Sequence, residues 1–199
     1  MTRVAIIDSG GANIASLLAA FERLGITARL TADADVIRNA ARVVLPGVGA
    51  ARDAMIRLHQ AGLVDVIPAL KQPVLGICLG MQLLCDRSEE DDATCLGIIP
   101  GTARKLPVAD SSPVPNMGWC ATGQVVSHPV LKDVADGAYF YYIHSYALPE
   151  SSYTIATTEH AGRFSSMLCK DNFVAAQFHP ERSSNAGARI LTNFLDWGA

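Results

Sequence analysis

Short apolar segments alternate with amphipathic segments in the N-terminal part of the chain, and this alternation limits the possible folds more than any other feature. Residues 3–8 and 43–45 have the apolar runs of strands that are buried on both faces of a sheet. Between them, apolar residues recur at the spacing of a helix until Gly25 interrupts the pattern. Because strands that alternate with helices form a parallel sheet with right-handed crossovers, the sequence predicts an α/β fold.

The pattern changes after Arg87, where the segments become short and strand-like, with frequent glycine and proline. A last helix is expected over residues 183–197, with a serine as its N-cap. We expect one domain over residues 1–199, with a central, mostly parallel sheet flanked by helices and a smaller antiparallel strand region. The other expected elements are strands over 26–30 and 73–77, helical segments over 50–70 with a break near Gly62, and a helix from Cys78 to Cys85.

The composition argues against several classes of protein. The formal net charge is −3 and there is no basic stripe, so a nucleic-acid partner is not expected. No apolar run is long enough to cross a membrane, and residues 1–3 lead directly into a strand, so we expect neither a membrane segment nor a signal peptide. The 5 cysteines have irregular spacing, which does not suggest a disulfide framework, and a reducing cytoplasm is the expected location.

Residues 74–82 carry the first indication of chemistry. An apolar run ends in Gly-x-Cys-x-Gly and continues as an amphipathic segment, which predicts a strand, a sharp turn and a helix with Cys78 at the turn. The glycines allow a tight turn with unusual backbone angles. A thiol at the start of a helix is favoured as thiolate by the helix dipole and by free N–H groups. Cys78 is therefore a candidate nucleophile.

A thiolate that transfers an acyl group needs a general base and a group that orients this base. His179 directly follows the apolar strand 173–178, at the strand end where open α/β sheets form their sites. Glu181 comes two residues later and can hold the second imidazole N–H, which would set the tautomer of His179. A simple surface turn at His-Pro-Glu is the alternative, and the presence of the cysteine turn disfavours it.

Backbone N–H groups are the candidates for an oxyanion site. The N–H of Leu79 directly follows the nucleophile, as in nucleophile elbows. The turn Pro46-Gly47-Val48-Gly49 follows another strand, and the Val48 N–H is the donor that we expect there. A phosphate-binding loop is the competing interpretation of this turn, but the Gly-Lys-Ser/Thr ending of such loops is missing.

Three other features have plainer interpretations. Residues 89–92 form a short acidic run, which we interpret as a solvated loop rather than a metal site. The other cysteines lack Cys-x-x-Cys spacing, so no metal is expected, and Cys85 is expected in the core. The aromatic segment 139–146 is compatible with plain strand packing and equally with the lining of a pocket or an interface.

These motifs carry a resemblance to a known family. The elbow and His179-Pro180-Glu181 resemble the triad, or class I, glutamine amidotransferases. Within that group, nearly the whole chain is similar to the family of glutaminase subunits of imidazole glycerol phosphate synthases. The stretches that narrow the resemblance are Asp8-Ser9-Gly10-Gly11-Ala12-Asn13-Ile14, Leu45-Pro46-Gly47-Val48-Gly49-Ala50, Asn116-Met117-Gly118-Trp119 and Tyr142-Ile143-His144-Ser145-Tyr146.

The resemblance implies a flavodoxin-like, class I glutaminase fold and the hydrolysis of L-glutamine to L-glutamate and ammonia. Cys78 would form a glutamyl thioester, His179 would protonate the departing ammonia and then activate water, and Glu181 would orient His179. The N–H groups of Val48 and Leu79 would hold the oxyanion. The positions that match glutamine contacts in this family are Gly49, Gln82, Ser145 and Tyr146.

The resemblance also implies a partner. In this family the ammonia passes to a separate (β/α)8-barrel cyclase subunit, which makes imidazole glycerol phosphate and an aminoimidazole carboxamide ribotide in histidine biosynthesis. A heterodimer is thus expected, and no cofactor. Trp119 is a candidate hot spot of that interface, with ordinary core burial as its alternative. The positions that match the family's cyclase interface are Asn13, Trp119, Tyr141 and Arg182.

Three departures from the family pattern concern the interface and activation rather than the triad: Ala12 replaces a common glycine, Asn116 a usual histidine, and Cys120 a frequent asparagine. The alternatives are the glutaminase of another synthase (for pyridoxal phosphate, anthranilate or GMP), a peptidase-like cysteine hydrolase and a non-catalytic regulatory subunit. The stretch 116–119 disfavours another synthase. Leu79 follows Cys78 where peptidase-like hydrolases often have a histidine, which disfavours that class, and the intact triad disfavours a non-catalytic subunit.

Overall fold

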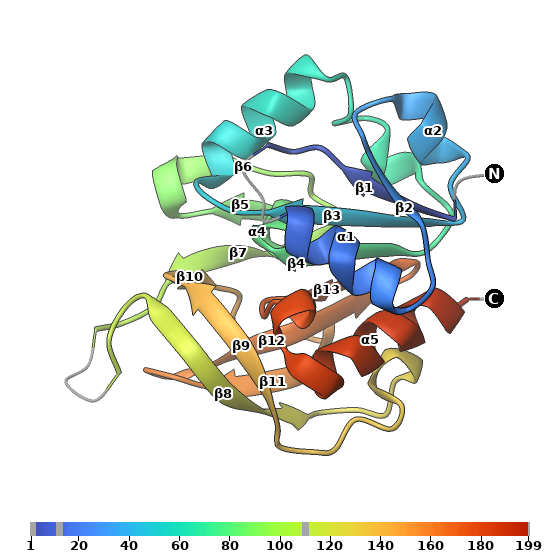
Figure 1. Cartoon of the computed structure of the whole chain (residues 1–199). Coiled ribbons are helices and arrows are strands. Elements are labelled where there is room, and N and C mark those ends of the chain that lie inside the picture. Colours follow the sequence, from blue (N-terminus) through green and yellow to red (C-terminus); the bar gives the residue numbers. More distant parts are fainter. Residues whose placement is uncertain (1–2, 11–13, 109–111, 199) are drawn as a thin grey trace.

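The computed structural model describes residues 3–10, 14–108 and 112–198, and Figure 1 shows how its elements are arranged. Asn13, which the sequence places at the expected interface, lies outside the described residues. In chain order the α-helices, 3-10 helices (η) and strands are β1 (Val4–Ile7), α1 (Ile14–Arg23), β2 (Ala28–Thr31), α2 (Ala34–Arg38), β3 (Arg42–Gly47), α3 (Ala51–Gln60), η1 (Ile67–Ala69), β4 (Val74–Cys78), α4 (Leu79–Leu83), β5 (Cys85–Ser88), η2 (Glu90–Asp92), β6 (Ala93–Thr94), β7 (Ile99–Lys105), β8 (Asn116–Gln124), η3 (Pro129–Leu131), β9 (Ala138–His144), β10 (Tyr146–Ala147), β11 (Thr154–Glu159), β12 (Arg163–Lys170), β13 (Phe173–Ala176), η4 (Pro180–Arg182) and α5 (Ser184–Asp196).

A nine-stranded sheet runs through the molecule, in the order β2-β1-β3-β4-β13-β12-β11-β8-β9. The first five strands are parallel, which confirms the predicted α/β fold. The last four pair antiparallel and extend the same sheet, because β13 pairs with β4 on one side and with β12 on the other. A second, four-stranded sheet has the order β10-β7-β5-β6.

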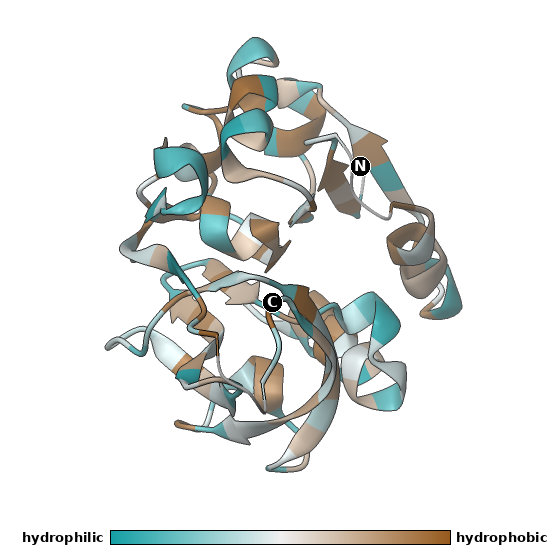
Figure 2. Ribbon diagram, turned by 90° about the vertical axis from the view of Figure 1, so that its left-hand side faces the viewer, coloured by the Kyte–Doolittle hydropathy of each residue, from teal (hydrophilic) through white to brown (hydrophobic). Residues whose placement is uncertain are grey.

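Two hydrophobic cores lie on opposite faces of the parallel strands. In β1, Val4 and Ile6 pack into one core while Ala5 and Ile7 pack into the other. This double burial explains why successive residues of the strand are apolar. Helices α1 and α5 contribute to the first core, and α2 and α3 to the second. Figure 2 shows hydrophobic segments in the central strands and hydrophilic segments in the outer turns and helices.

Two elements differ from the sequence-based expectation. The helix expected from Cys78 to Cys85 is the five-residue α4, and Cys85 instead begins β5, where it is buried as expected. The short helix α2 was not expected, although it has a clear start signal. The side chain of Asp33 accepts hydrogen bonds from the N–H groups of Asp35 and Val36 in the first turn of α2, as an N-cap residue does.

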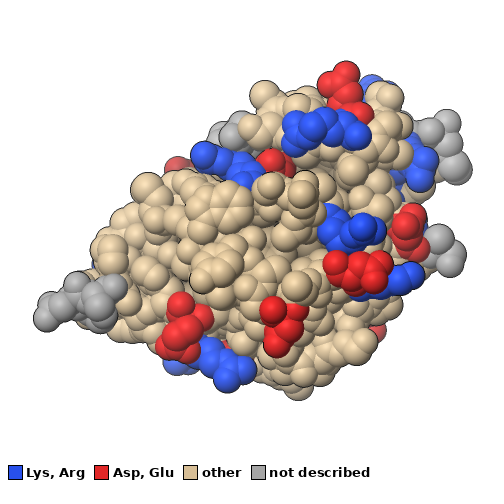
Figure 3. Space-filling view, turned by 60° about the horizontal axis from the view of Figure 1, so that its bottom comes forward, with Lys and Arg blue, Asp and Glu red and all other residues tan. Residues whose placement is uncertain are grey.

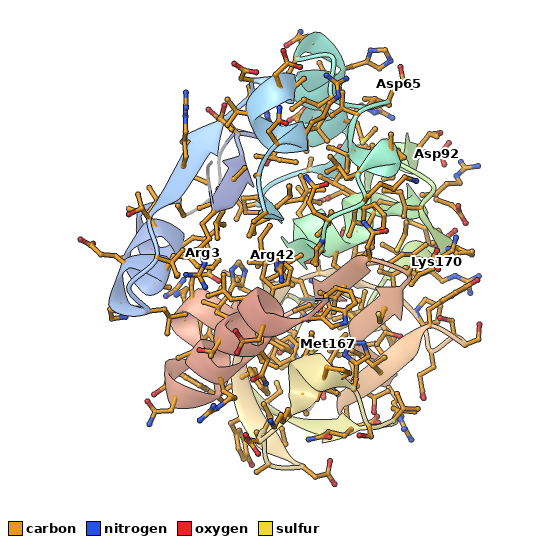
Figure 4. All side chains as sticks on the ribbon, turned by 90° about the vertical axis from the view of Figure 1, so that its right-hand side faces the viewer. Arg3, Arg42, Asp65, Asp92, Met167 and Lys170 are labelled. Atoms are coloured by element: carbon orange, nitrogen blue, oxygen red, sulfur yellow. The ribbon has the colours of Figure 1, made fainter. Side chains whose placement is uncertain are left out.

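Hydrogen bonds from strand β3 hold the C-terminal helix α5 against the parallel strands. Arg42, at the start of β3, donates hydrogen bonds to the carbonyl oxygens of Phe194 and Trp197, and Figure 4 shows Arg42 beside this helix. Ser183 occupies the predicted N-cap position of α5, and its carbonyl oxygen accepts from the N–H of Gly187, but its hydroxyl makes no capping hydrogen bond. Within the described part of the chain, no helix has the length and apolar character needed to cross a membrane.

Candidate active site

Cys78 lies at a strained turn between β4 and α4. Its backbone angles are φ 55° and ψ −111°, a region that costs a non-glycine residue about 1–3 kcal/mol. The turn is tight because α4 packs directly on β3: a Cβ atom at Gly80 would overlap the carbonyl oxygen of Leu45. The second glycine of the Gly-x-Cys-x-Gly motif is therefore required by packing, and the turn has the form of a nucleophile elbow.

Three parallel strands end together at this elbow. Gly47 of β3 is the register partner of Cys78 in β4, so Val48 begins the turn directly beside the nucleophile. On the other side, Ala176 of β13 pairs with Ile77, and the chain continues from there to His179. The site therefore forms at the carboxyl ends of neighbouring parallel strands, where open α/β sheets bind their ligands.

His179 and Glu181 form a buried pair. The Nδ1 atom of His179 lies 2.8 Å from Oε1 of Glu181, and the two side chains are 6% and 4% exposed. Burial alone would lower the pKa of the His179 imidazole, but the neighbouring Cys78 thiol and Glu181 carboxylate outweigh it and raise this pKa to about 10. The imidazole thus holds a proton well, as an acceptor of a thiol proton must.

Two buried side-chain polar atoms of the described residues have no hydrogen-bond partner, and both belong to this pair: Nε2 of His179 and Oε2 of Glu181. The Cys78 thiol donates instead toward the carbonyl oxygen of Ile143, with Sγ 3.7 Å from that oxygen. Nε2 makes no other hydrogen bond, so it is the ring atom through which His179 can exchange a proton with the nucleophile or with a leaving group.

A cavity of about 390 Å³ opens above the elbow. Eight residues that the sequence places in the site line it together, whereas Glu181 lies behind His179. The residues that line the cavity are Val48, Gly49, Ala50, Cys78, Leu79, Gln82, Glu90, Pro115, Ile143, His144, Ser145, Tyr146 and His179.

Glu90 is a cavity residue that the sequence-based interpretation missed. The acidic run 89–92 was expected to be a solvated loop, but η2 turns Glu90 toward the cavity while Asp91 and Asp92 stay exposed. Oε2 of Glu90 accepts a hydrogen bond from the N–H of Ala51 at 3.3 Å. Burial, with smaller contributions from neighbouring carboxylates, raises the pKa of Glu90. Because Glu90 lines the cavity, its ionised carboxylate gives the cavity a group that can bind a cation.

His144 also lines the cavity, as a neutral group. Its Nδ1 atom lies 2.9 Å from the carbonyl oxygen of Tyr146, and its Nε2 atom lies 3.2 Å from Nδ2 of Asn116. We assign the proton to Nδ1, because the carbonyl can only accept and the Asn116 amide can donate to Nε2. Burial lowers the pKa of His144 to about 4, so the ring is uncharged at neutral pH. This pocket-lining role resolves the open interpretation of the aromatic segment for His144.

Gln82 belongs to the same lining. Its Nε2 atom donates to the same Tyr146 carbonyl oxygen at 3.0 Å and lies 3.2 Å from Oε1 of Gln177. Gln177 is fully buried, and its own Nε2 atom lies 3.8 Å from Sγ of Cys78. A continuous set of polar contacts thus joins the nucleophile to the strand that lines the cavity.

The outer face of β8 and β9 is apolar and exposed. Met117, Trp119 and Tyr139 are 61%, 50% and 61% exposed, so Trp119 is not a core residue. Trp119 pairs across the strands with Tyr141, and their rings meet edge to face at 6.1 Å. The guanidinium of Arg182 lies over the Tyr141 ring, 4.4 Å from its centroid. Figure 3 shows a broad area without charged side chains on the side of the molecule where β8 begins.

Comparison with known proteins agrees with this geometry. Residues 5–197 match the family model described as glutamine amidotransferase class-I. The chain is 48% identical over 199 residues to imidazole glycerol phosphate synthase subunit HisH of Xylella fastidiosa (strain Temecula1), with both chains covered completely. It is 47% identical over 196 residues to the subunit of the same name from Xanthomonas euvesicatoria pv. vesicatoria (strain 85-10), covering 98% of each chain.

Solved structures show the same fold at low sequence identity. A putative GMP synthase subunit from Thermoplasma acidophilum has a TM-score of 0.75 at 18% identity, covering 98% of this chain and 93% of that one. A second structure, described as a glutamine amidotransferase, has a TM-score of 0.76 at 14% identity, covering 98% and 97%.

Proposed function

Because this chain belongs to the class-I glutamine amidotransferase family, we propose that it hydrolyses L-glutamine to L-glutamate and ammonia. It does so as the glutaminase subunit of an imidazole glycerol phosphate synthase, in histidine biosynthesis. The observation that carries this proposal is the convergence of Cys78, His179 and Glu181 at one cavity in a chain whose named relatives match it over its full length.

Catalysis proceeds through a thioester at Cys78. As His179 takes the thiol proton on Nε2, the sulfur attacks the side-chain amide carbon of glutamine. The tetrahedral intermediate collapses when His179 returns that proton to the leaving nitrogen, which departs as ammonia. A water molecule, deprotonated by His179, then attacks the thioester and releases glutamate and the thiol. Glu181 holds the Nδ1 proton throughout and so keeps Nε2 directed at the reaction.

Two backbone N–H groups provide the oxyanion site in this mechanism. The N–H of Leu79 is the first of α4 and directly follows the nucleophile. The N–H of Val48 lies in the turn beside Cys78, where the β3–β4 register brings it next to the elbow. The alternative of a phosphate loop at residues 46–49 is not supported, because Val48 and Gly49 of this turn line the cavity of the thiol.

Glutamine binds in the cavity with its side-chain amide at the thiol. Its α-ammonium group pairs with Glu90, the one carboxylate among the described residues that line the cavity. The polar lining of Gln82 and the backbone of the strand that includes Ser145 and Tyr146 position the rest of the amino acid, together with Gly49. The shape of the site thus suits a free amino acid with a terminal amide.

The partner is a (β/α)8-barrel cyclase that forms a heterodimer with this chain and consumes its ammonia. Ammonia would be mostly protonated in water near pH 7 and thus poorly nucleophilic, which favours a closed path between the subunits. The exposed apolar face of β8 and β9, with Trp119, Tyr141 and Arg182, is the surface we assign to this partner, since aromatic residues and arginine dominate protein interfaces. The chain acts as one domain over residues 1–199, in the cytoplasm.

The experiment that tests this function is a glutaminase assay of the chain alone, with the cyclase, and with the cyclase plus its nucleotide substrate. We expect low activity for the isolated chain and a rise of roughly tenfold or more in the loaded complex, within the usual range of coupling between sites. High activity of the isolated chain that the cyclase leaves unchanged would contradict the coupling. Stimulation by the synthase for pyridoxal phosphate or anthranilate instead would reassign the partner.

A further inference from the structure

Ser183 is fully buried between the catalytic loop and the edge strand β9. Its hydroxyl donates to the carbonyl oxygen of His179 at 2.6 Å and accepts from the N–H of Tyr141 at 3.0 Å. The N–H of His179 in turn donates to the carbonyl oxygen of Tyr141 at 2.9 Å. These three bonds, which we call the Ser183 clasp, hold both backbone groups of Tyr141 and both of His179.

The clasp is not explained by the ordinary role of a serine before a helix. A capping hydroxyl accepts from an N–H group in the first turn of its own helix, and the Ser183 hydroxyl makes no such bond. β9 is the last strand of the large sheet, so its outer edge has no strand partner. At Tyr141 the segment 179–183 takes the place of that strand. The buried Ser183 hydroxyl thus fixes the loop that carries the general base.

Tyr141 also belongs to the exposed apolar face. Its ring contacts Trp119 edge to face, and Arg182, which lies inside the clasped segment, stacks on it. The side chain of Tyr141 therefore faces outward while its backbone is bonded to His179. Because the backbones of Tyr141 and His179 are bonded directly, a small displacement of Tyr141 would be transmitted to the loop of the imidazole.

We propose that Ser183 is a positioning residue that couples the face of β8 and β9 to the catalytic histidine. Contacts made at Tyr141 and Arg182 pass through the clasp to the backbone of His179 and set the distance between Nε2 and the Cys78 thiol. This inference rests on the proposed function, because it assumes that the face receives the cyclase and that His179 is the general base.

The test replaces Ser183 by alanine (Ser183→Ala) in the complex with the cyclase and its nucleotide substrate. An irreversible glutamine analogue that alkylates Cys78 counts the competent sites, so that kcat is expressed for each folded site. We expect kcat for glutamine to fall about tenfold and its KM to change less than about twofold, because a lost buried hydrogen bond acts on the base and not on the substrate. Stimulation by the cyclase should fall as well.

Thr192→Ala is the matched control. It removes a similar hydroxyl-to-carbonyl bond within α5, from Thr192 to Ala188 at 2.9 Å, with no link to His179, and its kcat should equal that of the wild type. If Ser183→Ala yields no titratable sites, Ser183→Cys is measured in the same way. Because cysteine keeps a weaker donor and acceptor, kcat of this variant should fall below that of the wild type, by less than is expected for Ser183→Ala. An unchanged kcat and an unchanged stimulation in the variant measured would overturn the clasp. A wild-type complex that does not turn over glutamine would instead refute the proposed function.

Discussion

At the level of single residues, the site is built from charged groups that the fold buries fully or in part. The buried pair His179–Glu181 is one case, and the partly buried Glu90 in the cavity lining is another. Each is held by a hydrogen bond, between His179 and Glu181 in the first case and from the N–H of Ala51 in the second, before any substrate binds. Such groups are already oriented when the reaction begins, which lowers the cost of reorganisation in the transition state.

The role of Glu90 predicts a defect in binding rather than in chemistry. Glu90→Gln removes the charge that pairs with the α-ammonium group, so KM for glutamine should rise about tenfold while kcat changes little. The control is Asp91→Asn, in the same 3-10 turn but exposed, at a left-handed backbone position that asparagine tolerates. Steady-state kinetics of the complex measure both. Equal KM values for the two variants would remove Glu90 from the substrate site.

The pH dependence of KM follows from the same residue. Because burial raises the pKa of Glu90, its carboxylate is neutralised at a higher pH than that of an ordinary glutamate. KM of the wild type should therefore rise as the pH falls into the acidic range, and Glu90→Gln should lack this rise. This comparison uses the same assay as the mutational one.

Some of these residues could be predicted from the sequence and others could not. Cys78 and His179 stand in local motifs whose chemistry depends on short spacing, so both could be singled out without a structure. Glu90 lies in a run of four acidic residues, and nothing in the run indicates that only one of them turns inward. Its role depends on the N–H of Ala51, which is distant in sequence.

At the level of elements, the elbow depends on close packing between β3 and α4. Gly80→Ala would place a methyl group against the carbonyl oxygen of Leu45, where backbone has to move. We expect the variant to lose about 3 kcal/mol of stability, as in overpacked cores, and to melt roughly 10 °C lower. Gly123→Ala is the control, because its added Cβ meets only ordinary contacts. Thermal unfolding measures both, and a Gly80→Ala variant as stable as the wild type would contradict this account of the elbow.

The elements that sequence patterns predicted best are those with strong periodicity. The strands around residues 43–45 and 73–77 are buried on both faces and could be recognised by their apolar runs. Helix α4 was predicted too long, because the buried apolar run continues through Leu84 to Cys85, although Cys85 already begins β5. The serine before α5 fits a cap by residue type, but its hydroxyl bonds instead to the preceding loop at His179 and to the distant Tyr141.

At the level of the whole molecule, one sheet carries both the chemistry and the surface for a partner. Its parallel half positions the elbow and the histidine, and its antiparallel half ends in the exposed face of β8 and β9. The alternation of strands and helices predicted the first half. The second half consists of short segments with frequent glycine, for which the sequence does not determine which strands pair.

The most direct test of the central claim compares two nitrogen sources in the complex of the Cys78→Ala variant with the cyclase. The account predicts that synthesis from glutamine falls at least about a thousandfold while synthesis from added ammonium salt stays within about twofold of the wild type. Co-elution of the variant with the cyclase establishes that the complex is intact. Synthesis from glutamine that persists in this complex, or the loss of both activities together, would contradict the claim that Cys78 supplies ammonia to a separate active site.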